Sequence, residues 1–137
     1  MSEVLIPREK PVSLFATHAG STDEVAITNM IIDAVSTSVG YYKIKAGQKL
    51  RLNEFDLGAE EETRAYIEVS KNLETSTLVW MKVKGFKLSS KGHIGRSWRY
   101  PVIIEAYDYD HGVRFSFIQT SSGRVDVSAH GSVAPLS

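Results

Sequence analysis

Alternating carboxylates give the pattern in this chain that comes closest to metal chemistry. Asp108, Asp110 and Gly112 are spaced as at the start of a calcium loop, in which alternate carboxylates share one hard cation. A complete loop needs more oxygen ligands, including a later bidentate glutamate, whereas here Val113 and Phe115 begin an apolar strand pattern. Asp and Gly are also ordinary residues of tight turns. We therefore interpret the segment as a turn and predict no metal ion.

Patterns typical of enzyme active sites are missing from the sequence. No Gly-x-Ser-x-Gly elbow frames a serine. The three glutamates at residues 60–62 are interpreted as a solvated loop, and residues 92–95 are too short to cradle a phosphate. The histidines are expected in turns or near strand ends, without the close spacing of zinc hydrolases: His18, His93, His111 and His130. The sequence therefore predicts a protein that is not an enzyme and has no catalytic residues and no cofactor.

Aromatic rings alternate with guanidinium groups in the stretch Arg96-Ser97-Trp98-Arg99-Tyr100. Trp, Tyr and Arg concentrate in protein interfaces, so a protein contact is the leading functional interpretation. A carbohydrate platform comes second, and stacking on nucleic-acid bases comes last. The structural alternative is that Trp98 folds back and caps the protein's own core.

Charge is unevenly distributed along the chain. Residues 81–100 contain six basic side chains and no acidic one, whereas residues 53–62 contain five acidic side chains and no basic one. If the two segments are neighbours in the fold, they neutralise each other internally. If they are not, they form opposite patches suited to a self-complementary or head-to-tail contact between subunits.

The N-terminal residues 1–11 are predicted to form an extended arm, because Pro7 and Pro11 disfavour both a helix and a central strand. Val4, Leu5 and Ile6 make this arm apolar. It can therefore lie on its own domain or reach onto a neighbouring subunit.

The remaining chain, residues 12–137, is predicted to be one antiparallel β-sandwich domain. Residues 100–119 show period-2 alternation on both sides of the turn at residues 108–112, which predicts a β-hairpin. Residues 24–37 fit a helix or a strand, and their β-branched side chains favour a strand bent near Asn29. A phase slip predicts a bulge near Asn53. Further strands are expected at residues 12–17, 41–45, 49–57, 64–70, 78–88 and 124–133.

Two details of this prediction concern the basic half of the chain. Val79, Met81 and Val83 are expected to face the core, with the lysines between them facing solvent. The Gly-containing stretch at residues 89–99 is expected to be a loop.

Composition restricts the possible functions. The chain has 137 residues, which suits one domain with a real core. The 16 basic residues balance the 16 acidic residues, which argues against a dedicated nucleic-acid binder. The absence of cysteine excludes disulfides and thiolate chemistry. No apolar run of membrane-spanning length and no signal peptide are recognised, so we expect no membrane association.

Residues 42–52, with the sequence Tyr-Lys-Ile-Lys-Ala-Gly-Gln-Lys-Leu-Arg-Leu, resemble the strand-turn-strand entry of small jelly-roll proteins in tailed-phage particles. Residues 100–115 and 123–131 resemble the closing strands of the same sandwiches. The resemblance implies an accessory virion protein, of the capsid decoration (cement) type or a related head or tail component. Such proteins are expected to oligomerise and to clamp neighbouring capsid subunits with arms and loops.

From these observations we expect an all-β, jelly-roll-like structural protein of a phage particle, made in the host cytoplasm. Its expected partners are further copies of itself and a major capsid or other virion protein. A carbohydrate- or receptor-binding module, with Trp98 and Tyr100 as the sugar platform, is the alternative function. The residues hypothesised to form the protein interface are Val4, Leu5, Ile6, Arg96, Trp98 and Arg99.

Overall fold

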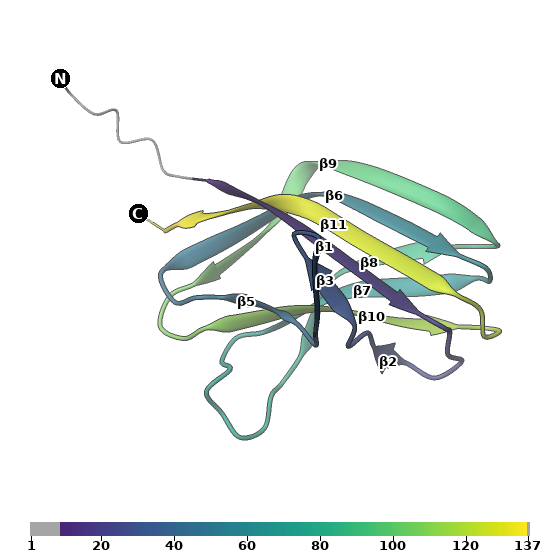
Figure 1. The fold of residues 1–137 in the computed structure, drawn as a ribbon, viewed down its shortest axis with the longest axis horizontal. Helices are drawn as coiled ribbons and strands as arrows, with labels where there is room; N and C mark the ends of the chain where they lie inside the picture. The colour runs from purple at the N-terminus through teal and green to yellow at the C-terminus, as the bar shows by residue number, and fades with distance from the viewer. Residues whose placement is uncertain (1–8, 137) are drawn as a thin grey trace.

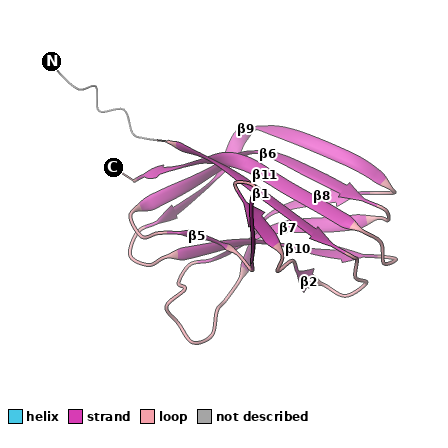
Figure 2. Cartoon of the chain, viewed as in Figure 1, coloured by secondary structure: helices cyan, strands magenta, loops and turns pink. Residues whose placement is uncertain are grey.

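A computed structural model describes residues 9–136 of the chain, with the backbone alone described at residues 36–38 and 96–100. Every regular element in this part of the chain is a β-strand (Figure 2). The strands, in chain order, are β1 (Lys10–His18), β2 (Val25–Ala26), β3 (Met30–Ile32), β4 (Val35–Val39), β5 (Tyr42–Ile44), β6 (Gln48–Ala59), β7 (Thr63–Ser70), β8 (Met81–Leu88), β9 (Gly92–Ala106), β10 (His111–Gln119) and β11 (Val125–Pro135).

The strands form two antiparallel sheets that pack face to face (Figure 1). Sheet A has the order β4-β3-β1-β11-β6-β9, and sheet B has the order β2-β10-β7-β8, with β5 also pairing with β10. Several successive long strands lie in different sheets, which is the interleaved connectivity of a jelly roll. The predicted all-β, jelly-roll-like sandwich is therefore confirmed.

The core lies between the sheets and follows from period-2 alternation. In β1, Val12, Leu14 and Ala16 are buried while the residues between them face outward. Between the two sheets the ring of the buried Phe55 stacks on the partly buried Phe86, with centroids 3.4 Å apart. This stacking contact joins β6 of sheet A to β8 of sheet B.

The segment predicted as a hairpin, residues 100–119, is not a hairpin. Its two arms are the end of β9 and the whole of β10, and these strands belong to different sheets. The turn between them connects sheet A to sheet B, so the apolar faces of the two arms meet across the core rather than side by side. Alternation of apolar residues specifies only which face of a strand is buried. The same alternation is expected for a hairpin within one sheet and for two strands that face each other across the core.

The stretch expected to be a loop, residues 89–99, is strand from Gly92 onward. It pairs with β6, where Gly95 lies opposite Asp56 and Gly92 lies opposite Ala59. A side chain at position 95 would meet the Asp56 carboxylate at 2.6 Å, so this glycine provides close approach within a strand rather than a turn.

Two other local predictions can be compared with the structure. Residues 24–37 were predicted as one bent strand, but they form β2, β3 and the start of β4. The chain leaves the strand conformation at residues 27–29, at the predicted bend, and it also turns at Asp33 and Ala34, which have positive φ. The bulge expected near Asn53 appears as a register shift between Leu52 and Glu54 in the pairing of β6 with β9.

Candidate functional site

Apolar side chains are exposed on strand β8, the last strand in the order of sheet B, and just before it in the chain. Val79, Met81 and Val83 were predicted to face the core, but their exposed fractions are 68%, 41% and 42%. The inward positions of β8 are instead occupied by Phe86, which packs against the core, and by the buried Leu88.

A bulge displaces Val83 from the predicted phase, whereas Met81 still lies opposite the buried Val69 of β7. Ile67 of β7 lies opposite Lys84, but the next residue, Glu68, lies opposite Lys82. Val83 is thus the extra residue, and it breaks the alternation that the sequence suggested. β8 is the last strand in the order of sheet B, and β7 is its neighbour in the described part of that sheet.

The outer face of sheet B carries a buried carboxylate held by charged and hydroxyl groups. Glu68 of β7 is 5% exposed. Arg114 of β10 donates from Nε to Glu68 Oε1 at 2.7 Å, and the Ser116 hydroxyl donates to Oε2 at 2.9 Å. Lys82 of β8 lies 3.8 Å from the same carboxylate and 2.7 Å from Glu24. The hydrogen bond to Glu24 raises the pKa of Lys82. Because Glu68 belongs to β7 and its partners belong to β8 and β10, the network links three neighbouring strands of sheet B.

The long β7–β8 connection, residues 71–80, is anchored on this network. The guanidinium of Arg114 lies 4.2 Å from the centre of the Trp80 ring, and Trp80 also contacts the ring of Tyr41. Beneath them is the buried Gly112, where a side chain would meet Trp80 at 2.9 Å and Leu73 at 3.0 Å. The glycine therefore lets the connection pack closely against β10.

A shallow hollow of about 240 Å³ adjoins the exposed end of β8. Its lining is a mixture of hydroxyl, amide and apolar groups, from Ser70, Lys71, Asn72, Thr75, Thr77, Val79 and Met81. Hydrogen bonds order the connection here: the Asn72 side chain accepts the N–H of Glu74 at 2.9 Å. The edge of β8 and this hollow form one continuous candidate surface, which we call the β8 edge.

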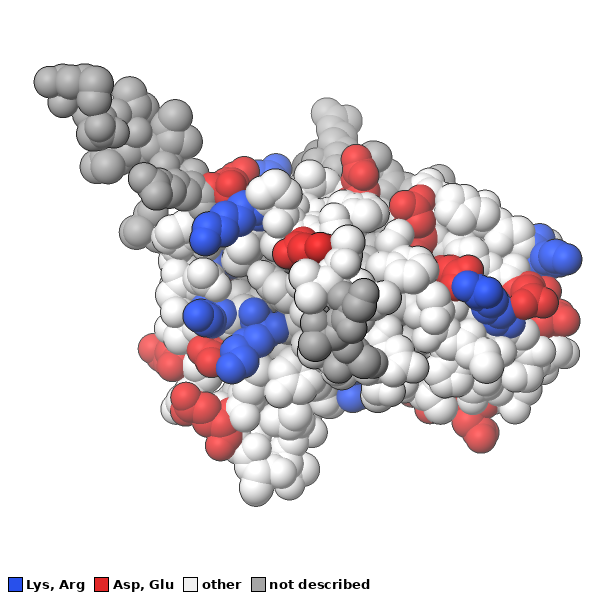
Figure 3. Space-filling view, in the orientation of Figure 1, with Lys and Arg blue, Asp and Glu red and all other residues white. Residues whose placement is uncertain are grey.

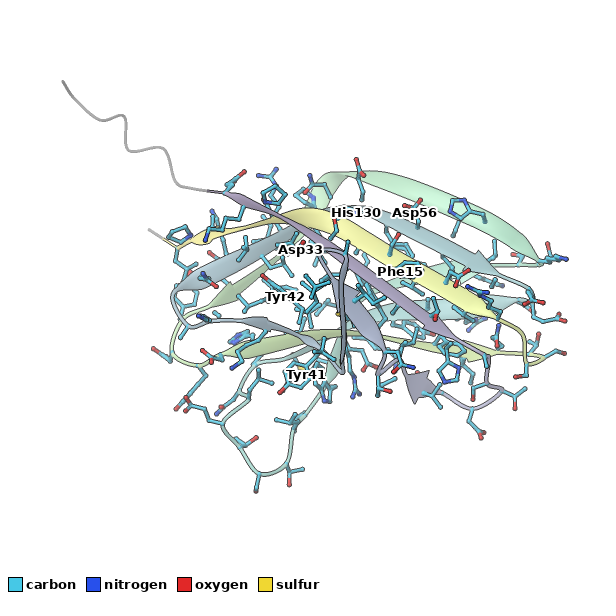
Figure 4. The ribbon with its side chains drawn as sticks, viewed as in Figure 1. Phe15, Asp33, Tyr41, Tyr42, Asp56 and His130 are labelled. Carbon is cyan, nitrogen blue, oxygen red and sulfur yellow. The ribbon has the colours of Figure 1, made fainter. Side chains whose placement is uncertain are left out.

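The outer face of sheet A carries a second candidate surface around Phe15, whose side chain is 40% exposed on the central strand β1. Ser13 Oγ of β1 lies 3.1 Å from His130 Nδ1 of the neighbouring β11. The Asp33 carboxylate accepts the backbone N–H of Ser13 at 2.8 Å. Figure 4 shows Phe15, Asp33 and His130 along the same side of the upper layer. In Figure 3 the basic side chains visible from this side lie mainly toward the two ends of the molecule.

The serine, histidine and aspartate of this surface do not form a catalytic triad. A triad needs the carboxylate on the far nitrogen of the histidine, whereas Asp33 binds the backbone of Ser13. Further along the sheet, Asp56 lies 3.6 Å from His93, and the Ser128 hydroxyl donates to Asp56 at 3.5 Å. These pairs lie on one sheet face and are ordinary surface contacts.

The predicted interface residues are placed only in part. Val4, Leu5 and Ile6 lie outside the described residues. Arg96, Trp98 and Arg99 belong to β9, but their side chains also lie outside the described part of the structure.

The acidic segment, residues 53–62, and the basic segment, residues 81–100, are neighbours in the fold, so the alternative in which they neutralise each other within one chain is the one observed. Strand β6 pairs with β9 along its length, and Glu62 lies 3.8 Å from Lys87. The charge pattern therefore gives no separate support for a contact between subunits.

The turn with alternating carboxylates has a structural role. One oxygen of Asp110 accepts the N–H of Ala46 at 2.8 Å, and the other lies 3.9 Å from the Lys43 ammonium. Among the described residues, no three histidine or acidic side chains are grouped so that they could hold a metal ion. In the same residues no helix has the length and apolar character needed to cross a membrane.

Comparison with known proteins gives similarity at the level of fold. No protein-family model matches the chain, and no curated protein matches it. A chain from the structure of the infectious bursal disease virus Gt strain is 10% identical with a TM-score of 0.49, and the match covers 93% of this chain and 32% of that one. A chain of the T13 particle of the same virus gives a TM-score of 0.41 at 10% identity, covering 93% of this chain and 37% of that one.

Eiger TNF from S. frugiperda is also 10% identical, with a TM-score of 0.45, covering 93% of this chain and 94% of that one. The chain thus spans about a third of the length of the viral chains that it matches. At these identities the likeness concerns the β-sandwich fold alone.

Proposed function

We propose that this protein is a non-enzymatic structural component of a virus particle. Its role would be that of a capsid decoration or cement protein of a tailed bacteriophage, made in the host cytoplasm, which oligomerises and stabilises contacts between neighbouring capsid subunits. The jelly-roll strand order is compatible with this role, because the architecture is common among capsid domains. Fold alone does not select a function, so the proposal rests on a surface.

The observation that carries the proposal is the β8 edge. Exposed large apolar side chains at Val79, Met81 and Val83 lie on and beside the last strand in the order of sheet B. Surfaces of this kind bind an added strand, with main-chain hydrogen bonds supplying affinity and side-chain contacts supplying specificity.

The chemistry of the edge indicates which strand would be added. Met81 and Val83 present exposed apolar side chains on this strand, so an apolar segment is complementary to it. Residues 4–6, Val-Leu-Ile, have this composition, so we assign the N-terminal arm of a second copy to the β8 edge.

Light scattering tests the proposal directly. The molar mass of the full chain is measured beside the Val83→Glu variant and a variant that lacks residues 1–8, which leaves β1 complete. Ile103→Glu is the matched control, because Ile103 is an exposed apolar residue of sheet A with an exposed fraction of 53%.

We expect an oligomer that dissociates to single chains in the Val83→Glu and truncated variants but not in the Ile103→Glu variant. A wild-type chain that is monomeric at every concentration, or a Val83→Glu variant of unchanged mass, would contradict the assignment.

A further inference from the structure

We propose that the hollow beside Phe15 on sheet A is a binding site for a neutral saccharide. The hollow has a volume of about 460 Å³, which lies within the range of small-molecule sites. The residues that matter for recognition come from β1, β11 and the β3–β4 turn: Ser13, Phe15, Ile31, Ala34, Ser128 and His130. This site is independent of the β8 edge, which belongs to the other sheet.

The apolar part of the hollow suits the C–H face of a pyranose ring. Phe15 projects from the outer face of a central strand, opposite Ile31 of β3, and it remains 40% exposed. A large aromatic side chain at such a position has no role in the sandwich core. Pyranose rings present a flat C–H face that packs on an aromatic ring, while their hydroxyls remain at the rim of the contact.

The polar groups at the hollow match the hydroxyls of a sugar. Ser13 and Ser128 carry hydroxyls that both donate and accept hydrogen bonds, as sugar hydroxyls also do. His130 places Nδ1 3.1 Å from Ser13 Oγ, which fixes the ring and leaves Nε2 as a further hydrogen-bonding group. Among the described residues that line the hollow there is no lysine or arginine, and the Asp33 carboxylate lies next to it on the Ser13 N–H, so an uncharged ligand is favoured over a phosphate or a carboxylate.

One wall of the hollow is the turn between β3 and β4, which contributes Ala34. Asp33 and Ala34 have φ values of 52° and 62°, in the left-handed region that non-glycine residues rarely adopt. Two hydrogen bonds hold this turn against β1, because the Asp33 N–H donates to the Ser13 carbonyl at 2.8 Å and the Asp33 carboxylate accepts the Ser13 N–H. Positive φ at both central residues is the usual geometry of a two-residue hairpin turn, here the turn between β3 and β4. The two hydrogen bonds fix this turn against β1.

The test is binding of neutral oligosaccharides to the full chain. A glycan array of gluco-, galacto- and manno-configured pyranosides identifies a ligand, and calorimetry measures its affinity for the wild type and three variants. Phe15→Ala removes the ring, and Ser13→Ala removes one hydroxyl from an exposed position with little effect on the fold. Ile103→Ala is the matched control on the outer face of the same sheet.

We expect at least one neutral glycan to bind, at least tenfold weaker binding by the Phe15→Ala variant, several-fold weaker binding by the Ser13→Ala variant and unchanged binding by the control. Absence of binding to every glycan would overturn the proposal. Binding that survives both the Phe15→Ala and the Ser13→Ala substitutions would place the sugar elsewhere and would also overturn it. A Phe15→Ala variant that binds no less tightly but loses oligomeric mass would assign this surface to a subunit contact instead.

Discussion

The ion pair between Glu68 and Arg114 provides the sharpest test of how the outer face of sheet B is stabilised. The Arg114→Met variant keeps most of the side-chain volume but removes the donor that lies 2.7 Å from the Glu68 carboxylate. It also removes the cation that lies over the Trp80 ring. Glu68, with a side-chain exposure of 7%, would then be left buried with the Ser116 hydroxyl and a more distant Lys82.

The expected cost follows from the contacts that are lost. A hydrogen bond to a charged group contributes about 1.5–3 kcal/mol, and breaking one partner of a fully buried ion pair costs about 3–5 kcal/mol. Arg114 is 26% exposed and Lys82 still lies 3.8 Å from the carboxylate, so solvent and the second cation reduce the larger figure. We therefore expect a loss of roughly 2–3 kcal/mol, or roughly 10 °C in Tm for a domain of this size.

Equilibrium urea unfolding followed by circular dichroism measures this loss without depending on the altered environment of Trp80. The matched control is Arg124→Met, which removes an ion pair of 3.2 Å between two exposed side chains, with exposures of 63% and 41%, and should cost less than about 1 kcal/mol. A Glu68→Gln variant completes a double-mutant cycle, with an expected coupling of at least about 1 kcal/mol. Equal losses in Arg114→Met and Arg124→Met would refute the reasoning, because burial would then not matter.

Two further predictions concern the core and alkaline pH. Phe55→Ala removes the ring stacked on Phe86 and should reduce the free energy of unfolding by about 3–5 kcal/mol. The control Ile103→Ala, at an exposed position, should change it by less than about 1 kcal/mol. Similar losses for the two variants in urea unfolding would contradict the assigned core. Burial, followed by the nearby Asp33 carboxylate, raises the pKa of Tyr42 above 10.0 in the folded state. The resulting stability is complete below pH 10.0 and is lost as pH rises through the folded pKa, so Tyr42→Phe should unfold with a weaker pH dependence in that range. Asp33→Asn should lower the pKa of Tyr42 in a spectrophotometric titration, and an unchanged midpoint would show that the carboxylate does not act on the phenol.

The sequence predicted most strands correctly because burial of one face imposes a two-residue period. Residues 64–70 and 124–133 alternate cleanly, and both are strands in the structure. The one large misassignment of pairing, the hairpin at residues 100–119, had correct strands and a correct turn. The error was in the partner, because hydrogen-bonded neighbours on one sheet and facing strands of two sheets bury the same alternate residues.

Side-chain sites were less predictable. The sequence contains a signal for the exposure of Phe15. Because Val12, Leu14 and Ala16 alternate as the buried residues of β1, Phe15 lies on the opposite, outer face of that strand. The exposure of Val83 had no such signal, because it depends on a bulge whose position is set by pairing with β7. The Glu68 network was equally hidden, because its partners come from strands that are distant in the sequence.

The sequence by itself determined that this chain is cysteine-free and charge-balanced, and it predicted an all-β fold whose inner and outer residues can largely be read from local alternation. Only the tertiary structure decided which sheet receives each strand, that β8 lies at an edge, and that Asp33, Ser13 and His130 meet on one surface. The physical reason is that local sequence encodes the conformation of a strand and the face that it buries. The identity of its neighbour is a property of the whole packed core, to which residues more than a hundred positions apart contribute, as Ser13 and His130 do.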